Sequence, residues 1–338
     1  MICRRFRPED KPAVISVLRE SIDDWQGDWA DAYWEWKFER NPRGPGRIWV
    51  GDDGGRIAGC YIWNPVRIRW GDTTFLGAQS VDAAVHPDYR GRGLFTDLAR
   101  TAMEDDATGE LALVYAFPVE AAVRGQVRVG FKPRLTVSSL HRPLLSGVMR
   151  RQRFHGLDVD TATSFHSRFD PFSQSGRDSE LTVARDAEYL QWRYCEHPTR
   201  GYETLVCERD GALCGYCVLS VDTTERLARG YVVDLQVLPD SDPAAAFLVF
   251  HALRRLRSRG ARVAISWARP AGPEQKGLAA LGFSPRYQSI QRRLRRARYM
   301  SQLLVFENQA GPLRELLASR GATDPLRWSL VPGDHDSM

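Results

Sequence analysis

The sequence predicts a mixed α/β protein in which one fold occurs twice in tandem. Two observations lead to this prediction. Short segments of the N-terminal half return in the C-terminal half at a nearly constant displacement, and strand-like and helix-like patterns succeed one another within each half. The length of 338 residues agrees with two domains. Each copy is therefore expected to hold a central mixed, mainly antiparallel sheet flanked by helices.

The repeat is clearest in an aromatic motif. YWEWKFERNP at 33–42 returns 156 positions later as YLQWRYCEHP, and the same displacement carries GRIAGCYI onto GALCGYCV. VDAAVHP and VGFKPR return after 152 positions as VDLQVLP and LGFSPR. These matches predict domains at 1–139 and 181–338, joined by a connector at 140–180. The aromatic residues have helical spacing and are expected to pack in the core; a role in the wall of a substrate pocket is the alternative.

Local patterns predict the elements of the first copy. The aromatic segment 34–39 is typical of a helix, and two alternating segments within 47–66, joined by Asp-Gly-Gly, predict a hairpin. A strand over 78–87 ends at a proline. The apolar residues that follow the next glycines recur at helical spacing and predict a buried stripe: Leu94, Phe95, Leu98, Ala99, Ala102 and Met103. A strand at 110–117 and a short helix that ends at Gly130 complete the copy.

Composition and charge indicate an ordinary globular protein. With 43% hydrophobic and 26% charged residues, the chain does not resemble a disordered one. Its start has no apolar segment typical of a signal peptide, and its longest apolar run, LALVYAFPV, is too short to cross a bilayer. We therefore expect a cytoplasmic protein with no membrane partner, either a monomer or a homodimer.

The cysteines and the acidic C-terminus give little support for a metal site. Of six cysteines only Cys214 and Cys217 form a CxxC, and their segment alternates like a strand, so the two thiols are expected to point to opposite faces. Buried free thiols are the preferred interpretation. The tail DHD at 334–336 is expected to be solvated, with entry into an acceptor site as the alternative. No metal is predicted.

Nucleic-acid binding is a weaker hypothesis for the basic residues. The net charge is +5, and the densest cluster is QRRLRRARY at 291–299. No stacking pattern of aromatic residues or known nucleic-acid motif accompanies it. A solvated face, or attraction for a small polyanion, explains the cluster more simply. The prediction is therefore that nucleic acid is not a partner.

The segment HPDYRGRGLF at 86–95 has the position of a phosphate site. It joins a predicted strand to a predicted helix, so the first N–H groups of the helix and the positive end of its dipole face whatever lies in front. Its two glycines allow close approach of a phosphate, and Arg90 and Arg92 add positive charge. The spacing matches neither the GxxxxGK[ST] loop nor the GxGxxG turn.

These residues resemble the GNAT superfamily of acyl-CoA-dependent N-acetyltransferases. The cofactor signature of that family, Arg or Gln, two residues, Gly, one residue, then Gly or Ala, follows a strand ending like VxP. Here Val85, Pro87, Arg90 and Gly93 match it, and Phe95 replaces the last small residue. The VGF ending at Phe131 and the opening RRFRPEDKPAVISVLRES are also similar to family elements. The resemblance covers about residues 1 to 135, and more faintly 181 to 290.

The resemblance implies acetyl-CoA, or another acyl-CoA, as co-substrate. Its pyrophosphate would be held by backbone N–H groups from Arg90 to Phe95, with the pantetheine along the strand. The implied cofactor-binding residues are Ala83, Ala84, Val85, Arg90, Gly91, Arg92, Gly93, Leu94 and Phe95. Phe95 is expected to turn into the buried stripe of its helix and to leave its N–H free.

The second copy is predicted to have lost the cofactor. At the corresponding place it has LPDSDPAAAF, without glycine or arginine and with Asp240 and Asp242 beside the helix start. Asp242 followed by Pro243 is expected to cap the helix. Two carboxylates there would repel a pyrophosphate. The chain thus resembles tandem GNAT proteins with one degenerate half.

Acyl transfer to an amine needs a base, an oxyanion donor and an acid for the leaving thiolate. The family often has a tyrosine as acid, but the corresponding position here is Gln126, which cannot donate a proton. We name three candidate catalytic residues: Asp82 as base or as a structural hydrogen-bonding group, Tyr115 as a substitute acid or a core residue, and Glu120 as a first-turn acid of its helix. The counterpart Asp234 persists in the second copy, which favours a structural role for Asp82.

The sequence thus predicts an enzyme that transfers an acyl group, most simply acetyl, from CoA to the primary amine of a small molecule. An amino sugar, an antibiotic or an amino-acid derivative is the expected acceptor class. A non-catalytic protein that binds acyl-CoA or a partner is the alternative, because Gln126 and Phe95 both permit it.

Overall fold

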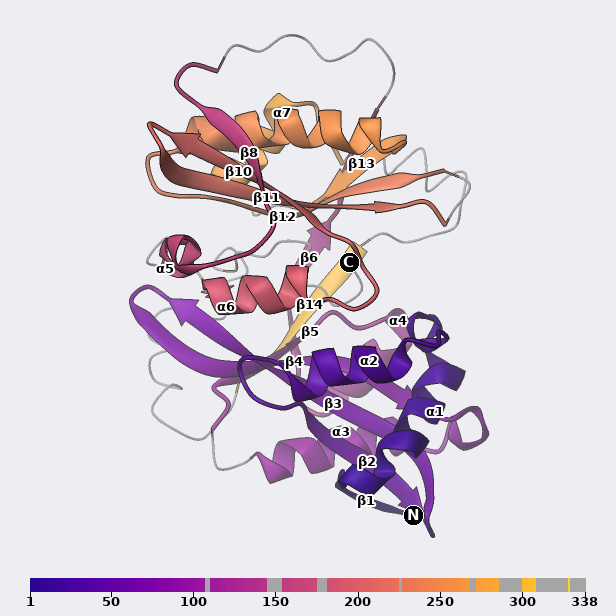
Figure 1. The fold of residues 1–338 in the computed structure, drawn as a ribbon. Helices are drawn as coiled ribbons and strands as arrows, with labels where there is room; N and C mark the ends of the chain where they lie inside the picture. The colour runs from indigo at the N-terminus through magenta and orange to yellow at the C-terminus, as the bar shows by residue number, and fades with distance from the viewer. Residues whose placement is uncertain are drawn as a thin grey trace.

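The computed structural model describes residues 1–106, 110–144, 154–174, 181–224, 227–267, 272–285, 300–307 and 328. The predicted basic cluster at 291–299 and the acidic tail at 334–336 lie outside these residues. In the described part the strands form two mixed sheets, one in each half, with helices against them (Figure 1). This agrees with the predicted fold class.

The first sheet has eight strands. Its order along the path is β1 (Ile2–Arg5), β2 (Arg47–Asp53), β3 (Arg56–Trp70), β4 (Thr73–Val85), β5 (Leu113–Ala116), β14 (Met300–Glu307) and β6 (Lys132–Ser138), and β9 (Leu181–Val183) pairs with β3. The helices of this half are α1 (Lys11–Ser21), α2 (Ala30–Trp34), α3 (Leu94–Asp105) and α4 (Glu120–Arg128). Among the strands that the structure describes in this sheet, β4 and β5 alone pair in parallel, and the other pairs are antiparallel.

The second sheet has six strands. Its order is β7 (Leu140–Pro143), β13 (Val263–Ser266), β12 (Arg229–Val237), β11 (Ala212–Asp222), β10 (Glu203–Arg209) and β8 (Asp158–Ala162). Its helices are α5 (Pro171–Gln174), α6 (Ala187–Leu190), α7 (Asp242–Ser258) and α8 (Pro273–Ala280). The parallel pair of this sheet, β12 and β13, corresponds to β4 and β5 of the first, as the repeat predicts.

Local sequence explains several of these elements. The Asp-Gly-Gly turn joins β2 to β3 with φ of +64° at Gly54 and +98° at Gly55, and the Asp52 carboxylate accepts the Gly55 N–H at 2.7 Å. The predicted stripe of α3 is buried at Leu94, Leu98, Ala99 and Ala102. α4 ends as expected before Gly130, whose φ is +104°.

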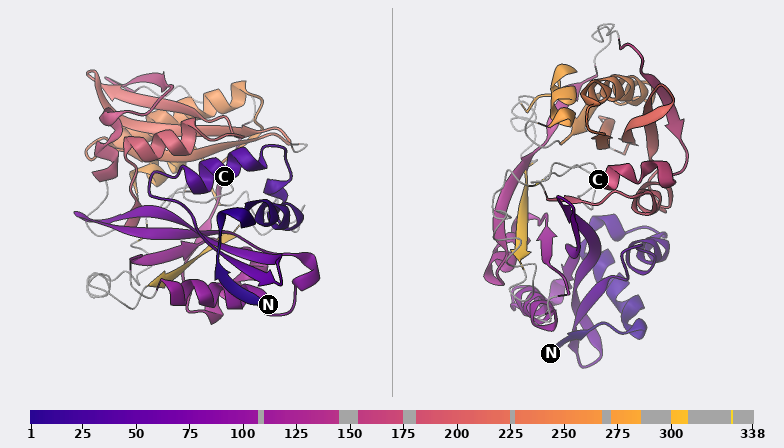
Figure 2. Two further views of the ribbon diagram at one scale, coloured as in Figure 1. Left: turned by 60° about the horizontal axis from the view of Figure 1, so that its bottom comes forward. Right: turned by 90° about the vertical axis from the view of Figure 1, so that its left-hand side faces the viewer.

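The two copies exchange strands. After β6 the chain crosses to the second sheet, where β7 pairs with β13; near its C-terminal end the chain returns, and β14 enters the first sheet between β5 and β6. The right-hand view of Figure 2 shows the yellow β14 beside the purple strands of the first copy. The sheets therefore do not follow the boundaries predicted at 139 and 181: β7 and β8 of the second sheet come from the connector, and β14 of the first comes from the C-terminal domain.

The aromatic motif lies where the copies meet. In each copy it forms a short α-helix followed by a π-turn, Glu35–Glu39 after α2 and Gln191–Cys195 after α6. Trp36 and Trp192 stack at 4.9 Å, and the indole Nε1 of each donates to the backbone carbonyl of the other at 2.8 Å. The contact is reciprocal between residues 156 positions apart, as expected for equivalent residues that meet across a local two-fold axis. Core packing of the motif is confirmed.

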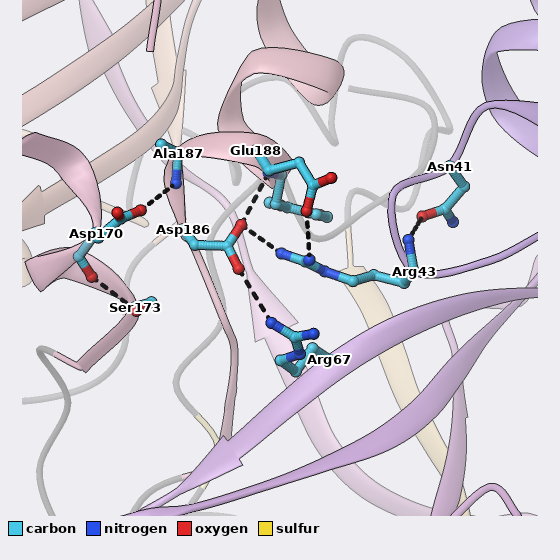
Figure 3. A network of polar contacts seen from close by, with 9 residues as sticks. Asn41, Arg43, Arg67, Asp170, Ser173, Asp186, Ala187 and Glu188 are labelled. Atoms are coloured by element: carbon cyan, nitrogen blue, oxygen red, sulfur yellow. Dashed lines mark hydrogen bonds and ion pairs between the residues drawn. The ribbon is translucent and has the colours of Figure 1, made fainter. Parts of the chain in front are cut away.

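A polar network at one edge of the interface joins the two halves (Figure 3). The side chain of Arg43, from the first copy, contacts the carboxylates of Asp186 and Glu188, and Arg67 on β3 reaches Asp186 at 3.3 Å. Asp186 also caps α6 by accepting the Tyr189 N–H at 2.9 Å. One carboxylate therefore fixes both a helix start and the contact between the copies.

The predicted divergence of the CxxC thiols is wrong. Cys207 pairs with Gly215 and Glu208 with Leu213, so Cys214 is an extra residue of β11 and its side chain joins the same core cluster as Cys217. Cys214 Sγ lies 3.4 Å from Cys207 Sγ, and all six cysteines are free. Buried free thiols are confirmed for Cys207, Cys214 and Cys217.

Candidate active site

A groove of about 500 Å³ lies in front of the α3 N-terminus. One wall is the end of β4, at Ala83, Ala84 and Val85, and the floor is the turn from Arg90 to Thr96. The opposite wall is α4 with the residue before it, Val119. The groove thus contains eight of the nine predicted cofactor-binding residues; the side chain of the ninth, Arg92, lies over the Tyr89 ring at 5.3 Å.

The glycines shape the floor of this groove. Gly91 and Gly93 have φ of +77° and +86°, a left-handed conformation that other residues adopt only at a cost. A Cβ atom on Gly91 would meet no protein atom within 4 Å, so this backbone borders open space. Because α3 begins at Leu94, the N–H groups of its first residues have no intrahelical acceptor. They are suited to an anionic group such as a phosphate.

Phe95 does not block the turn. Its ring packs edge-on against Tyr61 at 5.6 Å and lies over Gly125 of α4, where a Cβ atom would come within 2.5 Å of it. The side chain is thus directed into the core, as expected, and the missing side chain at Gly125 makes room for it. The N–H of Phe95, in the first turn of α3, points along the helix axis out of its N-terminal end and has no intrahelical acceptor.

The groove follows from the divergence of two parallel strands. β4 and β5 pair only from Ala78 to Ser80 with Val114 to Ala116. β4 then continues to Val85, whereas the chain after β5 turns away into α4. Among the described residues, no strand therefore pairs with this side of β4 beyond Ser80. An extended ligand can lie along it by strand-like hydrogen bonding.

The three candidate catalytic residues are not brought together. Asp82, on β4, has its carboxylate 2.5 Å from the ammonium of Lys37, with side-chain exposures of 9% and 1%. Tyr115, on β5, is buried and packs against Phe117 and Trp328. Glu120 is exposed in the first turn of α4. None of the three lines the groove in the described part of the chain. Their catalytic roles stay predictions.

Gln126 is buried beneath the groove. Its amide Nε2 donates to Ser80 Oγ at 3.4 Å, at the point where β4 and β5 separate, and among the described residues its Oε1 has no partner. The hydroxyl of Tyr61 is buried beside it, and burial raises the pKa of Tyr61 to about 12. These groups form a buried polar cluster next to α4 without lining the groove, and the neutral amide cannot protonate a leaving group.

The sequence interpretation missed several groove residues, among them Arg124, Arg128 and Ser21. Arg124 and Arg128 of α4 line the groove four positions apart and add cations opposite Arg90. Ser21, the last residue of α1, donates to the Val85 carbonyl at 3.3 Å, and Arg90 Nε donates to the same oxygen at 3.2 Å. The i, i+4 spacing of the two arginines was a usable signal, since it places them on one helix face.

The second copy has a different helix start. α7 begins at Asp242, with Ser241 at the N-cap position and no capping bond from a side chain, so the predicted cap at Asp242 is wrong by one residue. Asp240 is exposed with φ of +61°, and Asp242 is exposed 3.9 Å from Lys276. Two carboxylates thus stand beside the start of α7, and at the displacement of 152 Asp242 takes the place of Arg90.

Comparison with known proteins agrees with this geometry. Residues 3–133 match the family model described as acetyltransferase (GNAT) domain. No curated protein sequence matches the chain. A probable N-acyltransferase of Enterococcus faecalis, described as a conserved protein of unknown function, has a TM-score of 0.68 at 11% identity, covering 91% of this chain and 73% of that one.

Two further solved structures are similar. A GCN5-related N-acetyltransferase from Anabaena variabilis has a TM-score of 0.67 at 13% identity, covering 91% of this chain and 73% of that one. A tandem GNAT protein from the clavulanic acid biosynthesis pathway has a TM-score of 0.57 at 17% identity, covering 92% of this chain and 99% of that one. At these identities the likeness shows the fold.

Residues 3–133 thus match an acetyltransferase (GNAT) domain, and the chain shares its fold with a GCN5-related N-acetyltransferase and with a tandem GNAT protein. Among the described residues, no helix is long and apolar enough to cross a membrane, and no group of three or more His, Cys, Asp or Glu side chains is placed to hold a metal ion.

Proposed function

We propose that this protein transfers an acetyl group from acetyl-CoA to a primary amine of a small molecule, using the groove of the first copy. The observation that supports this most directly is the glycine turn at the α3 N-terminus, which opens into a groove lined by three cations, Arg90, Arg124 and Arg128. The free cysteines fit a reducing compartment, and we assign the protein to the cytoplasm.

Different residues of the groove are suited to different parts of acetyl-CoA. Backbone N–H groups from Gly91 to Phe95 are suited to the pyrophosphate, and the arginines of α4 to a further phosphate. The backbone of Ala83 to Val85 is suited to the amide groups of pantetheine, which brings the thioester towards Ser80 and Gln126 at the strand divergence. The amine then attacks the carbonyl carbon, the C–N bond forms, and the C–S bond breaks.

Proton transfer in this reaction needs no tyrosine at position 126. The acceptor ammonium must lose one proton before it attacks as the neutral amine, and the nitrogen loses a second proton as the amide forms; this second proton goes either to the sulfur, so that CoA leaves as the thiol, or to solvent, so that CoA leaves as the thiolate. Gln126 can donate an amide hydrogen bond to the sulfur without protonating it. A backbone N–H near Val85 is the proposed oxyanion donor, as the family resemblance implies.

Isothermal titration calorimetry tests the binding part of this proposal. Wild type is expected to bind acetyl-CoA, and Arg90→Glu is expected to bind it at least tenfold more weakly, because a carboxylate would then face the phosphates. Arg254→Glu is the matched control, since Arg254 is an exposed arginine of α7 in the second half. Equal affinity of Arg90→Glu and Arg254→Glu would contradict binding at this groove.

A second candidate function is acyl-CoA binding without catalysis. It is favoured by the buried amide of Gln126 where the family often has its acid. The two functions differ in one assay: release of CoA thiol from acetyl-CoA in the presence of amino sugars, aminoglycosides and amino-acid derivatives. Release above the rate without protein for any amine supports transfer, whereas tight binding with no release across the panel supports the non-catalytic protein.

A further inference from the structure

β4 bends at a residue that is not glycine. Val81 pairs with Ile62 of β3, and Ala84 pairs with Cys60, so Tyr61 alone stands opposite Asp82 and Ala83. Asp82 is left-handed, with φ of +44°. The strand therefore contains a β-bulge immediately before the three residues that line the groove. A left-handed backbone conformation is costly for a residue with a Cβ atom, and it persists only where surrounding contacts stabilise it.

The side chain of Asp82 shows what holds this backbone. Its Oδ2 lies 2.5 Å from Nζ of Lys37, which comes from the π-turn after α2 and is 1% exposed. The same ammonium lies 3.3 Å from the Tyr33 hydroxyl. A buried ion pair is costly to break, because each charge would be left without its partner. If Asp82 slipped into regular pairing, its side chain would move relative to Lys37 and this contact would be lost.

The second copy shows that the aspartate alone does not produce this geometry. Asp234 corresponds to Asp82, yet it pairs regularly with Val218 and its backbone is not left-handed. The irregularity of β12 lies at Val233 instead. Arg185 Nε and the Tyr194 hydroxyl, each at 2.9 Å, hold the Asp234 carboxylate. The left-handed aspartate and its lysine thus occur together in the copy with the glycine turn.

We propose that Lys37 is a positioning residue for acyl-CoA: its ion pair with Asp82 holds the bulge that turns the backbone of Ala83 to Val85 towards the groove. This inference rests on the proposed function, since the groove is assigned to acyl-CoA. It also gives Asp82 a positioning role in place of the role of general base. The S–H of Cys60, which approaches the Asp82 carbonyl at 3.6 Å, supports the same bend from β3.

Two double variants separate the ion pair from the backbone conformation. Lys37→Met with Asp82→Gly removes both charges and places at position 82 a residue that adopts positive φ without cost. Lys37→Met with Asp82→Ala removes the same charges but disfavours that conformation. Acetyl-CoA affinity is measured by calorimetry, and the register of β4 by crystallography of each variant.

We expect the glycine variant to bind acetyl-CoA within about threefold of wild type. The alanine variant is expected to bind acetyl-CoA roughly five- to thirtyfold more weakly. In its crystal structure, the residue at position 82 is expected to pair regularly with β3, without the bulge. Equal affinity of the alanine variant and wild type would overturn the proposal. The proposal would also be overturned if both variants bound acetyl-CoA with wild-type affinity but lost acyl transfer, because that result would make Asp82 a catalytic base. If the alanine variant does not fold, serine replaces alanine at position 82.

Failure of the proposed function gives a different result. If wild type does not bind acetyl-CoA, the assignment of the groove is wrong, and the β4 register alone decides the inference about Lys37. A bulge that persists in the alanine variant would then show that the ion pair does not hold it. A regular strand in that variant, with a bulge kept in the glycine variant, would support the role of Lys37 as a positioning residue.

Discussion

His197 is buried at the centre of the contact between the two copies. Its ring lies 4.2 Å from the Trp36 ring, and its Nδ1 accepts hydrogen bonds from the backbone N–H groups of Thr199 at 3.3 Å and Arg200 at 3.2 Å. Burial, together with the charges of Arg193, Arg200 and Lys37, lowers the pKa of His197 to about 2. The residue is therefore neutral in the folded protein at every pH near neutrality.

This histidine is expected to make the protein less stable in mild acid. In the unfolded chain a histidine takes up a proton below about pH 6.5, whereas folded His197 does not, so stability falls as the pH drops below that value. Between pH 7.5 and 5.5 wild type should lose about 1.4 kcal/mol more unfolding free energy than His197→Asn, whose amide oxygen can still accept the N–H bonds. Urea unfolding at both pH values measures this, and equal losses in the two proteins would contradict it.

At the residue scale, sequence reasoning located the glycine turn that borders the groove but not the conformation of Asp82 beside it. Glycines and arginines between a strand and a helix are a local signal, and Gly91 and Gly93 have the positive φ that such a turn requires. The left-handed Asp82 has no local signal, because it lies within an alternating strand and depends on Lys37, 45 positions away. The wrong prediction for Cys214 has the same cause, since no local pattern signals the extra residue in β11 that turns the Cys214 side chain to the face of Cys217.

At the scale of elements, the packing of α3 against α4 depends on one glycine. Gly125 lies mid-helix, where glycine costs stability, and a Cβ atom there would come within 2.5 Å of Cδ1 and 2.6 Å of Cε1 of Phe95. The phenyl ring thus fills the space that a side chain at 125 would take. Because Phe95 also lines the groove, this contact couples helix packing to the shape of the binding site.

Gly125→Ala is therefore expected to push Phe95 towards the groove. We expect a loss of roughly 1–3 kcal/mol in unfolding free energy, typical of overpacking, and weaker binding of acetyl-CoA. Phe95→Ala in the same chain should relieve the clash, so that the double variant binds more tightly than Gly125→Ala alone. Urea unfolding and calorimetry on the four proteins of this cycle measure both effects. Additive effects would mean that the two residues do not interact.

At the scale of the whole molecule, the two copies form one structure by exchanging strands. The repeated segments predicted the number of copies and the correspondence of their elements, because each copy has its own local periodicity. It did not indicate that β14 lies between β5 and β6, because this position depends on pairing between residues that are far apart in the sequence. Buried Trp328, which bridges to Leu181 and packs against Tyr115, makes a further contact of the C-terminal region with the first copy.

The groove should consequently depend on residues far from it in the sequence. A chain ending at residue 299 retains every groove residue but lacks β14, whose Leu303, Leu304 and Val305 are buried in the first sheet. Without it, β5 has one edge exposed and loses its antiparallel partner. We expect this chain to lose acetyl-CoA binding and cooperative thermal unfolding, whereas a chain ending at residue 307 should retain measurable binding because β14 is present. Circular dichroism and calorimetry on the two truncated chains test this, and full acetyl-CoA affinity in the shorter one would show that the first copy does not need the exchanged strand.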